Sequence, residues 1–308
     1  MKFLKPKFWD QEYSFLSLIL LPISLFYQLA VFLRKKFIKQ KSFPIPIICI
    51  GNIYIGGTGK TPLAIKTFEI LKNFNKNPVI IKKEYQNQKD ELLLLKNYCK
   101  VISPKNRIEG IKNSVEKGFD TIILDDGFQD IEIKKNLNIL CFNSFQKIGN
   151  GLTLPSGPLR ENLRSLENCH YVFMNGEKDL EFENKLKRYN SKLKFFYYNY
   201  YSKNINEFKN RKLVAFAGIG NPVNFFNYLK SNRLNVVKEI SYPDHYSYSD
   251  KELDNLKRIE KAHNAKLITT EKDFFRINPI FRKRVNYLPI KIKINEDLFK
   301  KEILNSIL

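Results

Sequence analysis

The chain has 308 residues, 43% of them hydrophobic, so it is long and apolar enough to bury the core of one large domain or two medium ones. Its formal charge of +22 favours an anionic partner, such as nucleic acid, an anionic membrane surface or a phosphorylated substrate, although a general drift toward Lys, Asn, Ile and Phe would also produce it. The four cysteines form no Cys-x-x-Cys pair and the three histidines are scattered, which argues against a disulfide framework and a zinc cluster.

Residues 1–44 form a distinct N-terminal region. The run Tyr13–Leu33 carries no charge, is mostly large and apolar, and is flanked by basic residues on both sides. Its length of about 20 residues just suffices to span a bilayer, but Pro22 interrupts it, serines and Gln28 give it a partly polar side, and the flanks set no orientation. We expect a monotopic helix in the membrane interface, with a true span or a helix packed on the protein itself as alternatives.

The strongest signal lies between the apolar, β-prone run Ile45–Ile53 and the amphipathic segment Leu63–Phe74. The residues between them are glycine-rich and end in Gly59-Lys60-Thr61, which gives the order strand, phosphate loop, helix. Glycines let the backbone approach an anion closely, and the following helix directs the positive end of its dipole to the same point. The predicted nucleotide-binding residues are Gly56, Gly57, Thr58, Gly59, Lys60, Thr61 and Pro62.

Lys60 and Thr61 give this loop its chemistry. Lys60 can reach the β- and γ-phosphates of a nucleotide, and the Thr61 hydroxyl can ligate Mg²⁺. Tyr54 stands where the phosphate-loop pattern has its first glycine. A glycine-rich turn that binds nothing is the alternative, but it leaves the Lys-Thr pair at the mouth of the helix unexplained.

From Phe43 onward, strands and helices alternate, which is typical of a parallel α/β sheet. The further strands expected are Pro78–Ile81, Val101–Ile102, Asp120–Leu124, Leu137–Phe142 and Tyr171–Asn175, and the helices between them are Leu92–Tyr98 and Asn106–Lys117. Ligands of such sheets bind at the carboxyl ends of the strands, so the residues that follow each strand are the ones to inspect for function.

Two acids, Asp125 and Asp126, follow the strand Asp120–Leu124 directly. An acid after an apolar strand is the Walker B arrangement, so we expect this pair to face the phosphate loop and help hold Mg²⁺. A rigid Pro/Gly loop further on presents Arg160, which can pair with a phosphate, and Glu161, which can support the metal. For these last two residues, a surface turn with a solvated ion pair is the alternative.

The C-terminal third indicates a second α/β domain. The aromatic stretch Lys194–Lys203 is expected to leave the first domain as a β-ribbon, and a new strand-turn-helix pattern begins at Lys212. The predicted fold class is α/β: a P-loop NTPase-like, mostly parallel sheet domain with an N-terminal membrane helix, plus a second smaller α/β domain joined by a β-ribbon. The predicted boundaries are 1–44 for the membrane-associated helix region, 45–190 for the P-loop nucleotide-binding domain, 191–211 for the ribbon and 212–308 for the C-terminal domain.

Six motifs, in their order along the chain, resemble those of the tetraacyldisaccharide 4′-kinases, the lipid A 4′-kinases of Gram-negative bacteria. The resemblance runs from about residue 13 to residue 273, and the motifs are Gly51-Asn52 through Thr61-Pro62, Asp125-Asp126-Gly127-Phe128-Gln129, Leu154-Pro155-Ser156-Gly157-Pro158-Leu159-Arg160-Glu161, Ala215-Phe216-Ala217-Gly218-Ile219-Gly220-Asn221-Pro222, Pro243-Asp244-His245 and Thr270-Glu271-Lys272-Asp273. Each motif alone is modest evidence, but six in the family's order are highly specific.

The resemblance implies a transferase that uses ATP and Mg²⁺ to phosphorylate the 4′-hydroxyl of a lipid A disaccharide 1-phosphate, giving lipid IVA, in lipopolysaccharide biosynthesis. It would act as a peripheral or monotopic protein at the cytoplasmic face of the bacterial inner membrane, with Tyr13–Leu33 at the membrane surface and the lipid A disaccharide precursor as its partner. The phosphate loop, the basic charge and the apolar N-terminal run agree with this. A monomer is expected, and nucleic acid is not expected as a partner.

Carried over residue by residue, the resemblance assigns roles at the site. The catalytic residues are Lys60, Asp90 and His245, the metal-site residues are Thr61, Asp125, Asp126 and Glu161, and the substrate-contacting residues are Asn52, Gln129 and Arg160. Asp90 would accept the proton of the acceptor hydroxyl and be oriented by His245. The chain departs from the family before Asp90, where Lys82–Gln86 replaces a Ser-Arg-Gly-Tyr-Gly stretch and the usual flanking glycine and proline are missing. Asp130 stands where the family commonly has a histidine.

Two other classes of protein remain open at this point. A P-loop GTPase needs an Asn-Lys-x-Asp motif, which Asn175–Asp179 and Thr270–Asp273 do not match in spacing, and a nucleic-acid-dependent NTPase would leave Tyr13–Leu33 unexplained. A membrane-bound nucleotide switch acting on another anionic partner would tolerate the loss of Asp90 and His245, whereas the kinase would not.

Overall fold

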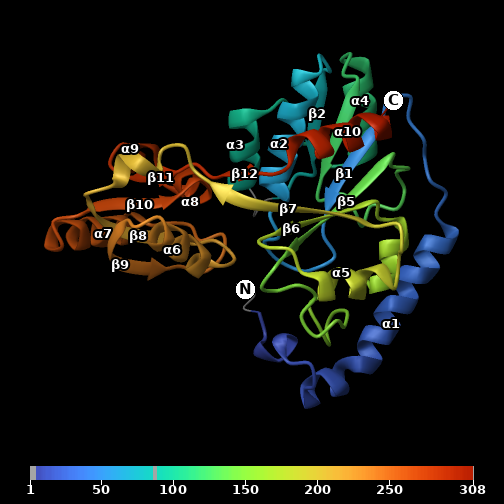
Figure 1. Ribbon diagram of the computed structural model, residues 1–308, viewed down its shortest axis with the longest axis horizontal. Coiled ribbons are helices and arrows are strands. Elements are labelled where there is room, and N and C mark those ends of the chain that lie inside the picture. Colours follow the sequence, from blue (N-terminus) through green and yellow to red (C-terminus); the bar gives the residue numbers. More distant parts are fainter. Residues whose placement is uncertain (1–4, 86–88, 308) are drawn as a thin grey trace. The chain divides into compact units, whose positions relative to one another are not determined.

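The computed structural model describes residues 5–85 and 89–307 (Figure 1). These residues form two compact units. The larger unit holds the residues up to Glu84, Cys99–Asn199 and those from Ile292 onward, and the smaller unit holds Tyr85–Tyr98 and Tyr200–Lys291. Gln86, one of the residues that depart from the family pattern, lies outside the described residues.

An eight-stranded sheet forms the centre of the larger unit, in the order β12-β7-β6-β5-β1-β4-β2-β3 (Figure 1). Its strands are β1 (Ile47–Gly51), β2 (Pro78–Lys82), β3 (Val101–Ile102), β4 (Thr121–Asp125), β5 (Leu137–Asn143), β6 (Tyr171–Asn175), β7 (Lys194–Tyr201) and β12 (Lys291–Lys293). The pairings from β3 across to β7 are parallel. Every residue of β1, β2 and β4 is buried, as in parallel sheets that are covered on both faces. The predicted parallel α/β sheet is therefore confirmed.

The helices of the larger unit are α1 (Phe15–Phe37), α2 (Lys60–Asn73), α4 (Arg107–Glu116), α5 (Leu180–Lys187) and α10 (Glu296–Ile307), with 3-10 turns at Lys7–Asp10 and Leu163–Asn168. α2 packs on β1, β2 and β4. It buries Leu63, Phe68 and Leu71 toward the sheet side of its surface, so an apolar face fixes the helix that follows the phosphate loop.

The smaller unit is built on a four-stranded parallel sheet in the order β11-β10-β8-β9. Its elements are α3 (Lys89–Tyr98), a 3-10 turn at Ile205–Phe208, β8 (Lys212–Ala217), α6 (Pro222–Ser231), β9 (Asn235–Ser241), α7 (Asp250–Ala262), β10 (Lys266–Thr270), α8 (Glu271–Arg276), α9 (Pro279–Arg282) and β11 (Asn286–Leu288). Apolar clusters on both faces of the sheet, one with Phe225 and one with Leu256, form its core. The second, smaller α/β domain is thus present.

The unit boundaries differ from the sequence-based ones in three places. β7, expected in a separate ribbon, pairs in parallel with β6, and its buried Phe196 stacks on Phe173 with ring centroids 4.9 Å apart. β12 and α10, expected in the C-terminal domain, have most of their residues in the larger unit, where Phe299 of α10 packs on the same two rings. α3, expected in the nucleotide-binding domain, belongs to the smaller unit and packs on α8. Each difference arises from contacts between residues that are distant in sequence, which local patterns do not encode.

α1 belongs to the larger unit and lies along its surface (Figure 1). Most of its large apolar side chains are exposed. Its 23 residues and its mean hydropathy of 2.2 would suffice to cross a membrane by length and composition alone. The residues of α1 that the protein buries are Ser17 and Ser24. The helix is therefore both attached to the protein, as one alternative predicted, and apolar on its outside.

Candidate active site

The phosphate loop joins β1, which ends at Gly51, to α2, which begins at Lys60. Gly59 has a φ of 84° and Gly56 a φ of 118°, which L side chains rarely adopt, so both positions favour glycine. The first turn of α2 therefore presents free backbone N–H groups to the loop, which is the arrangement that binds phosphate. The predicted strand, phosphate loop and helix are all present.

Two side chains hold this loop in shape from within. Asn52 is fully buried, and its amide nitrogen donates to the carbonyl oxygens of Tyr54 at 2.6 Å and Gly56 at 3.2 Å. The amide nitrogen of Gln129 donates to the carbonyl oxygen of Asn52 at 2.8 Å. In this structure Asn52 and Gln129 therefore support the loop, and their direct contact with substrate stays a prediction.

Asp126 lies at the centre of a cluster of cations. The parallel register places Asp125, the last residue of β4, beside Ile50 of β1, so both acids lie where the phosphate loop begins. The carboxylate of Asp126 is 3.5 Å from Nζ of Lys60 and 3.2 Å from Nη1 of Arg160. Burial pushes the pKa of Asp126 upward, but the charges of Lys60 and Arg160 outweigh it and hold this pKa below its usual value. The structure thus brings three of the predicted site residues together.

Two cations that the sequence analysis did not single out complete this cluster. Lys82, the buried last residue of β2, places its Nζ 2.9 Å from Oδ2 of Asp125. Arg107, the first residue of α4, donates to the carbonyl oxygen of Asp126 at 2.8 Å and to the carboxylate of Asp130 at 3.0 Å. Lys82 had a signal in the sequence, because it directly follows the predicted strand Pro78–Ile81, which was expected in the same sheet as Asp125. Arg107 had none, because its contacts depend on how α4 packs.

One carboxylate oxygen of Asp125 is suited to act as a ligand of a metal ion. Its Oδ1 is buried and has no hydrogen-bond partner among the residues that the structure describes, whereas buried polar atoms normally have one. Thr61, whose hydroxyl the sequence predicts as a Mg²⁺ ligand, lies in the first turn of α2. Mg²⁺ takes oxygen ligands, commonly one or two carboxylates together with phosphate oxygens and water, so this donor set fits. Among the described residues, no group of three or more His, Cys, Asp and Glu could hold a metal, so phosphate oxygens would complete the site.

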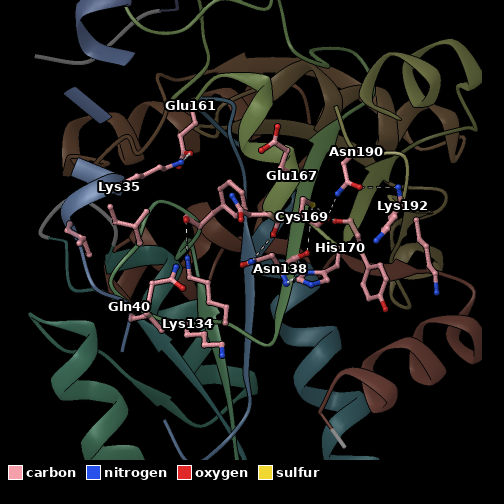
Figure 2. Close-up of a pocket in the computed structure, with 18 residues that line it drawn as sticks. Lys35, Gln40, Lys134, Asn138, Glu161, Glu167, Cys169, His170, Asn190 and Lys192 are labelled. Carbon is pink, nitrogen blue, oxygen red and sulfur yellow. Dashed lines mark hydrogen bonds and ion pairs between the residues drawn. The ribbon is translucent and has the colours of Figure 1, made fainter. Parts of the chain in front are cut away.

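Glu161 is already engaged by another cation. Its carboxylate is buried and pairs with Nζ of Lys35, in the last turns of α1, as Figure 2 shows. The pair lies in the wall of a cavity of about 820 Å³. Lysines and polar residues line much of this cavity, among them Gln40, Lys134, Asn138, His170 and Lys192 (Figure 2). A role for Glu161 at the metal stays a prediction.

A second charged cluster surrounds Asp90, in the first turn of α3 in the smaller unit. Asp90 is 4% exposed; its Oδ1 is 3.2 Å from Nδ1 of His245, and its Oδ2 accepts hydrogen bonds from Nε and Nη2 of Arg276 at 3.1 and 2.6 Å. Burial raises the pKa of Asp90, but the hydrogen bond with His245 and the charges of Arg276 and Lys272 outweigh it and lower the pKa to about 2. The same hydrogen bond raises the pKa of His245. The predicted Asp90–His245 pair is therefore present, with an ionised carboxylate.

Arg276, which the sequence analysis did not single out, links two of the sequence motifs to Asp90. Its Nη1 donates to Oδ1 of Asp273 at 2.8 Å and to the carbonyl oxygen of Gly218 at 2.5 Å. Asp273 is fully buried and also accepts hydrogen bonds from the Gly218 N–H at 3.0 Å and the Tyr248 hydroxyl at 2.9 Å. The motifs around Gly218 and Asp273 thus hold the guanidinium that binds Asp90. A signal was available, since Arg276 follows Asp273 by one helical turn.

The larger unit has a parallel sheet, a phosphate loop at the end of β1, two acids at the end of the neighbouring β4, and cations around them. This combination defines a P-loop nucleotide-binding protein. An ionised carboxylate held by a histidine adds a group that can orient a hydroxyl and accept its proton. The family model described as tetraacyldisaccharide-1-P 4′-kinase matches residues 16–308. The chain belongs to the tetraacyldisaccharide 4′-kinase family.

Similar proteins agree with this assignment. The tetraacyldisaccharide 4′-kinase of Pelagibacter ubique is 43% identical over 301 residues, which cover 96% of either chain. The tetraacyldisaccharide 4′-kinase of Rickettsia typhi is 36% identical over 98% of this chain and 99% of its own. The crystal structure of LpxK from Aquifex aeolicus in complex with ATP superimposes with a TM-score of 0.74 at 25% identity, covering 95% of this chain and 100% of that one. The predicted family, fold class and enzyme class are confirmed.

Proposed function

We propose that this protein transfers the γ-phosphoryl group of ATP to the 4′-hydroxyl of a lipid A disaccharide 1-phosphate, giving lipid IVA and ADP. The hydroxyl oxygen forms a bond to the γ-phosphorus, the bond between that phosphorus and the bridging oxygen of ADP breaks, and the hydroxyl proton passes to a base. The observation that carries this proposal is the match of nearly the whole chain to one kinase family, with the phosphate loop in place.

Lys60 and Arg160 supply positive charge for the phosphates. Phosphoryl transfer depends mostly on positioning and on stabilising charge on the phosphate oxygens. Both cations pair with Asp126 here, so an incoming phosphate competes with Asp126 for them. Asp126 therefore keeps the two cations in place until the nucleotide binds, and the N–H groups at the start of α2 act on the same oxygens.

Asp125 and Thr61 are the residues that would hold Mg²⁺, with Asp126 and Glu161 as the further predicted ligands. When bound, the ion neutralises charge on the phosphate oxygens. Oδ1 of Asp125 supports this assignment most directly, because it is buried and has no hydrogen-bond partner among the described residues, while the other oxygen of Asp125 pairs with Lys82.

Asp90 is the group that would receive the hydroxyl proton. A carboxylate with a pKa of about 2 is ionised at physiological pH but is a weak base. In a loose transition state the hydroxyl needs orientation first and loses its proton late, so a fixed, ionised acceptor suffices. His245 and Arg276 hold the carboxylate in place, because His245 contacts Oδ1 of Asp90 and Arg276 donates to Oδ2.

The uncovered apolar side of α1 supports a place at a membrane surface. The last turn of α1 carries Arg34, Lys35 and Lys36. The large apolar side chains of α1 that are more than half exposed are Phe15, Leu16, Leu18, Ile19, Ile23, Leu25, Phe26, Leu29, Phe32 and Phe37. An apolar face with a basic end binds an anionic membrane interface. We infer a monotopic position at the cytoplasmic face of the inner membrane, the side on which ATP is available.

The reaction is tested by transfer of label from γ-³²P-ATP to detergent-solubilised lipid A disaccharide 1-phosphate. Wild-type protein should label the lipid, and hydrolysis of ATP without the lipid should stay much slower. ATP binding or hydrolysis without any transfer would contradict the kinase and favour the membrane-bound nucleotide switch.

The membrane position has its own test. Replacing both Phe26 and Phe32 by serine should reduce flotation with vesicles made of bacterial lipid while the melting temperature is kept, because both rings are exposed. Unchanged flotation would place the contact with the membrane elsewhere.

A further inference from the structure

α1 is an amphipathic helix that turns its polar side toward the protein and its apolar side outward. Phe15, Phe26 and Phe32 are more than 60% exposed, whereas Ser24 is completely buried and Ser17 almost so. Helices on the surface of soluble proteins bury their apolar stripe instead. The membrane-facing side accounts for the apolar residues, and the buried serines need a separate explanation.

Ser24 is bonded to the segment 150–162, which we name the proline loop. The Ser24 hydroxyl lies 2.8 Å from the Ser156 hydroxyl and 3.0 Å from the carbonyl oxygen of Thr153, and it accepts the Ser156 N–H at 3.0 Å. Ser156 is also completely buried. One hydroxyl therefore bonds backbone groups at two positions of the proline loop: it accepts the Ser156 N–H, and it adds to the bond that the Gly157 N–H already makes to the Thr153 carbonyl oxygen at 3.0 Å.

Other polar side chains of α1 bind the same loop on either side of Ser24. Gln28 donates to the Thr153 hydroxyl at 2.9 Å and accepts from the Asn162 amide at 3.1 Å. The Ser17 hydroxyl accepts from the Asn150 amide at 3.1 Å. The polar side of α1 is thus matched to the proline loop along three helical turns.

The proline loop reaches the phosphate loop from its other side. The Ile55 N–H donates to the carbonyl oxygen of Pro158 at 2.9 Å, and the Arg160 N–H donates to that of Ile53 at 2.7 Å. The Arg160 side chain continues to Asp126, with Nη1 at 3.2 Å from both carboxylate oxygens. The Tyr27 hydroxyl of α1 donates to the Arg160 carbonyl oxygen at 2.9 Å. One segment therefore contacts the membrane helix and the phosphate loop at once.

We propose that Ser24 is a positioning residue for phosphoryl transfer: it fixes the proline loop on α1 and so holds Arg160 at Asp126. The proposal rests on the proposed kinase reaction, in which Arg160 serves the phosphates. It gives α1 a second task, distinct from membrane binding. The helix that holds the enzyme at the lipid also shapes the site that phosphorylates it.

The first experiment compares Ser24→Ala with Ser114→Ala. Ser114 is an equally buried helical serine in the same unit, but its hydroxyl donates to Gly110 of its own helix at 2.7 Å. In the label-transfer assay, Ser24→Ala should lower kcat about 10-fold, because small displacements of a positioning group have such effects. Ser114→Ala and the conservative Ser24→Thr should stay near wild type, and vesicle flotation of Ser24→Ala should be unchanged. Lost flotation together with unchanged kcat per bound enzyme would assign Ser24 to membrane attachment and overturn the proposal.

A double-mutant cycle separates positioning from mere loss of stability. If Ser24 acts through Arg160, Ser24→Ala should have little further effect on kcat in an Arg160→Gln background. An equal loss of kcat in both backgrounds, at equal folded fraction, would overturn the proposal. Ser156→Ala removes the same contact from the loop side and should reproduce the result if Ser24→Ala folds poorly. A wild-type protein without transfer activity would instead refute the proposed function itself.

Discussion

The two charged clusters of this protein are organised differently. In the larger unit, Asp126 shares its carboxylate between Lys60 and Arg160, and Oδ1 of Asp125 has no hydrogen-bond partner in the described part of the chain. In the smaller unit, both oxygens of Asp90 have charged or polar side-chain partners. The first cluster can exchange partners when phosphates arrive, whereas the second is complete before any substrate binds. A nucleotide brings its own charge, so its site must be able to rearrange, but a proton acceptor must be oriented in advance.

The largest effect is expected where the first cluster loses its exchangeable cation. Lys60→Ala should lower kcat/KM for ATP in the label-transfer assay by on the order of 10³-fold, because it removes the charge that the first turn of α2 brings to the phosphates. Lys72→Ala, in the exposed last turn of the same helix, is the matched control and should stay within about twofold. Comparable losses in both variants would mean that Lys60 has no special role.

Removing the cation of the second cluster should damage the fold rather than substrate binding. Arg276→Gln leaves Asp90 and Asp273 buried without their guanidinium, so the free energy of unfolding should fall by about 3 kcal/mol in urea denaturation. Arg282→Gln is the control, since Arg282 donates to the backbone carbonyls of Ile277 and Phe275 and lies over the Phe274 and Phe275 rings, so its loss leaves no buried carboxylate behind and should cost less. Equal losses would remove the distinction between the clusters.

The pH dependence of that loss has a defined sign. The pKa of Asp90 is about 2 in the folded protein, below its ordinary 3.8, so its contribution to stability is fully present above about pH 4 and is lost as the pH falls toward 2. In Arg276→Gln this pKa moves back up. The difference in unfolding free energy between wild type and variant should therefore shrink as the pH falls from about 4 toward 2. A constant difference would show that Arg276 does not set the pKa of Asp90.

Asp90→Asn keeps the shape of the second cluster and removes its proton acceptor. The kcat for lipid phosphorylation should fall on the order of 10²-fold, while the dissociation constant for ATP, measured by calorimetry, should not change. This variant also tests the assignment of Asp90 itself, which rests on a segment that departs from the family pattern. Full activity would keep the kinase and move the base to another residue.

The smallest effect is expected at the rim of the first cluster. Asp130→Asn removes one partner of Arg107 but leaves its hydrogen bond to the carbonyl oxygen of Asp126. Because the Arg107–Asp130 pair is partly exposed on its acidic side, the loss in unfolding free energy should stay below about 1 kcal/mol, with kcat within about twofold of wild type. A large loss of kcat would show that the pair, and not the carbonyl contact alone, maintains the position of Asp126.

The sequence predicted the parts of the site that depend on neighbours along the chain. The phosphate loop, the acids after β4 and the alternation of strands and helices each follow from short-range spacing and polarity. The position of Arg107 could not be predicted, because its contacts depend on how α4 packs. For Arg276, the spacing from Asp273 was a signal for that contact but not for the contact with Asp90, which lies on another element. The same holds for α3, whose charged and apolar residues specify a helix but not which sheet it joins. Aromatic β7 was predicted as a strand, and only its pairing with β6 differed.

The placement of α3 has a consequence for dissecting the enzyme. The chain passes between the units at residues 84–85, 98–99, 199–200 and 291–292, so neither unit is one continuous stretch of polypeptide. A fragment of residues 200–291 would contain His245 and Arg276 without the carboxylate that binds them. Such a fragment should regain its ordered form only when a peptide covering α3 is added in trans. Each unit is therefore built from more than one segment of the chain, so truncation at a single position cannot yield either unit whole.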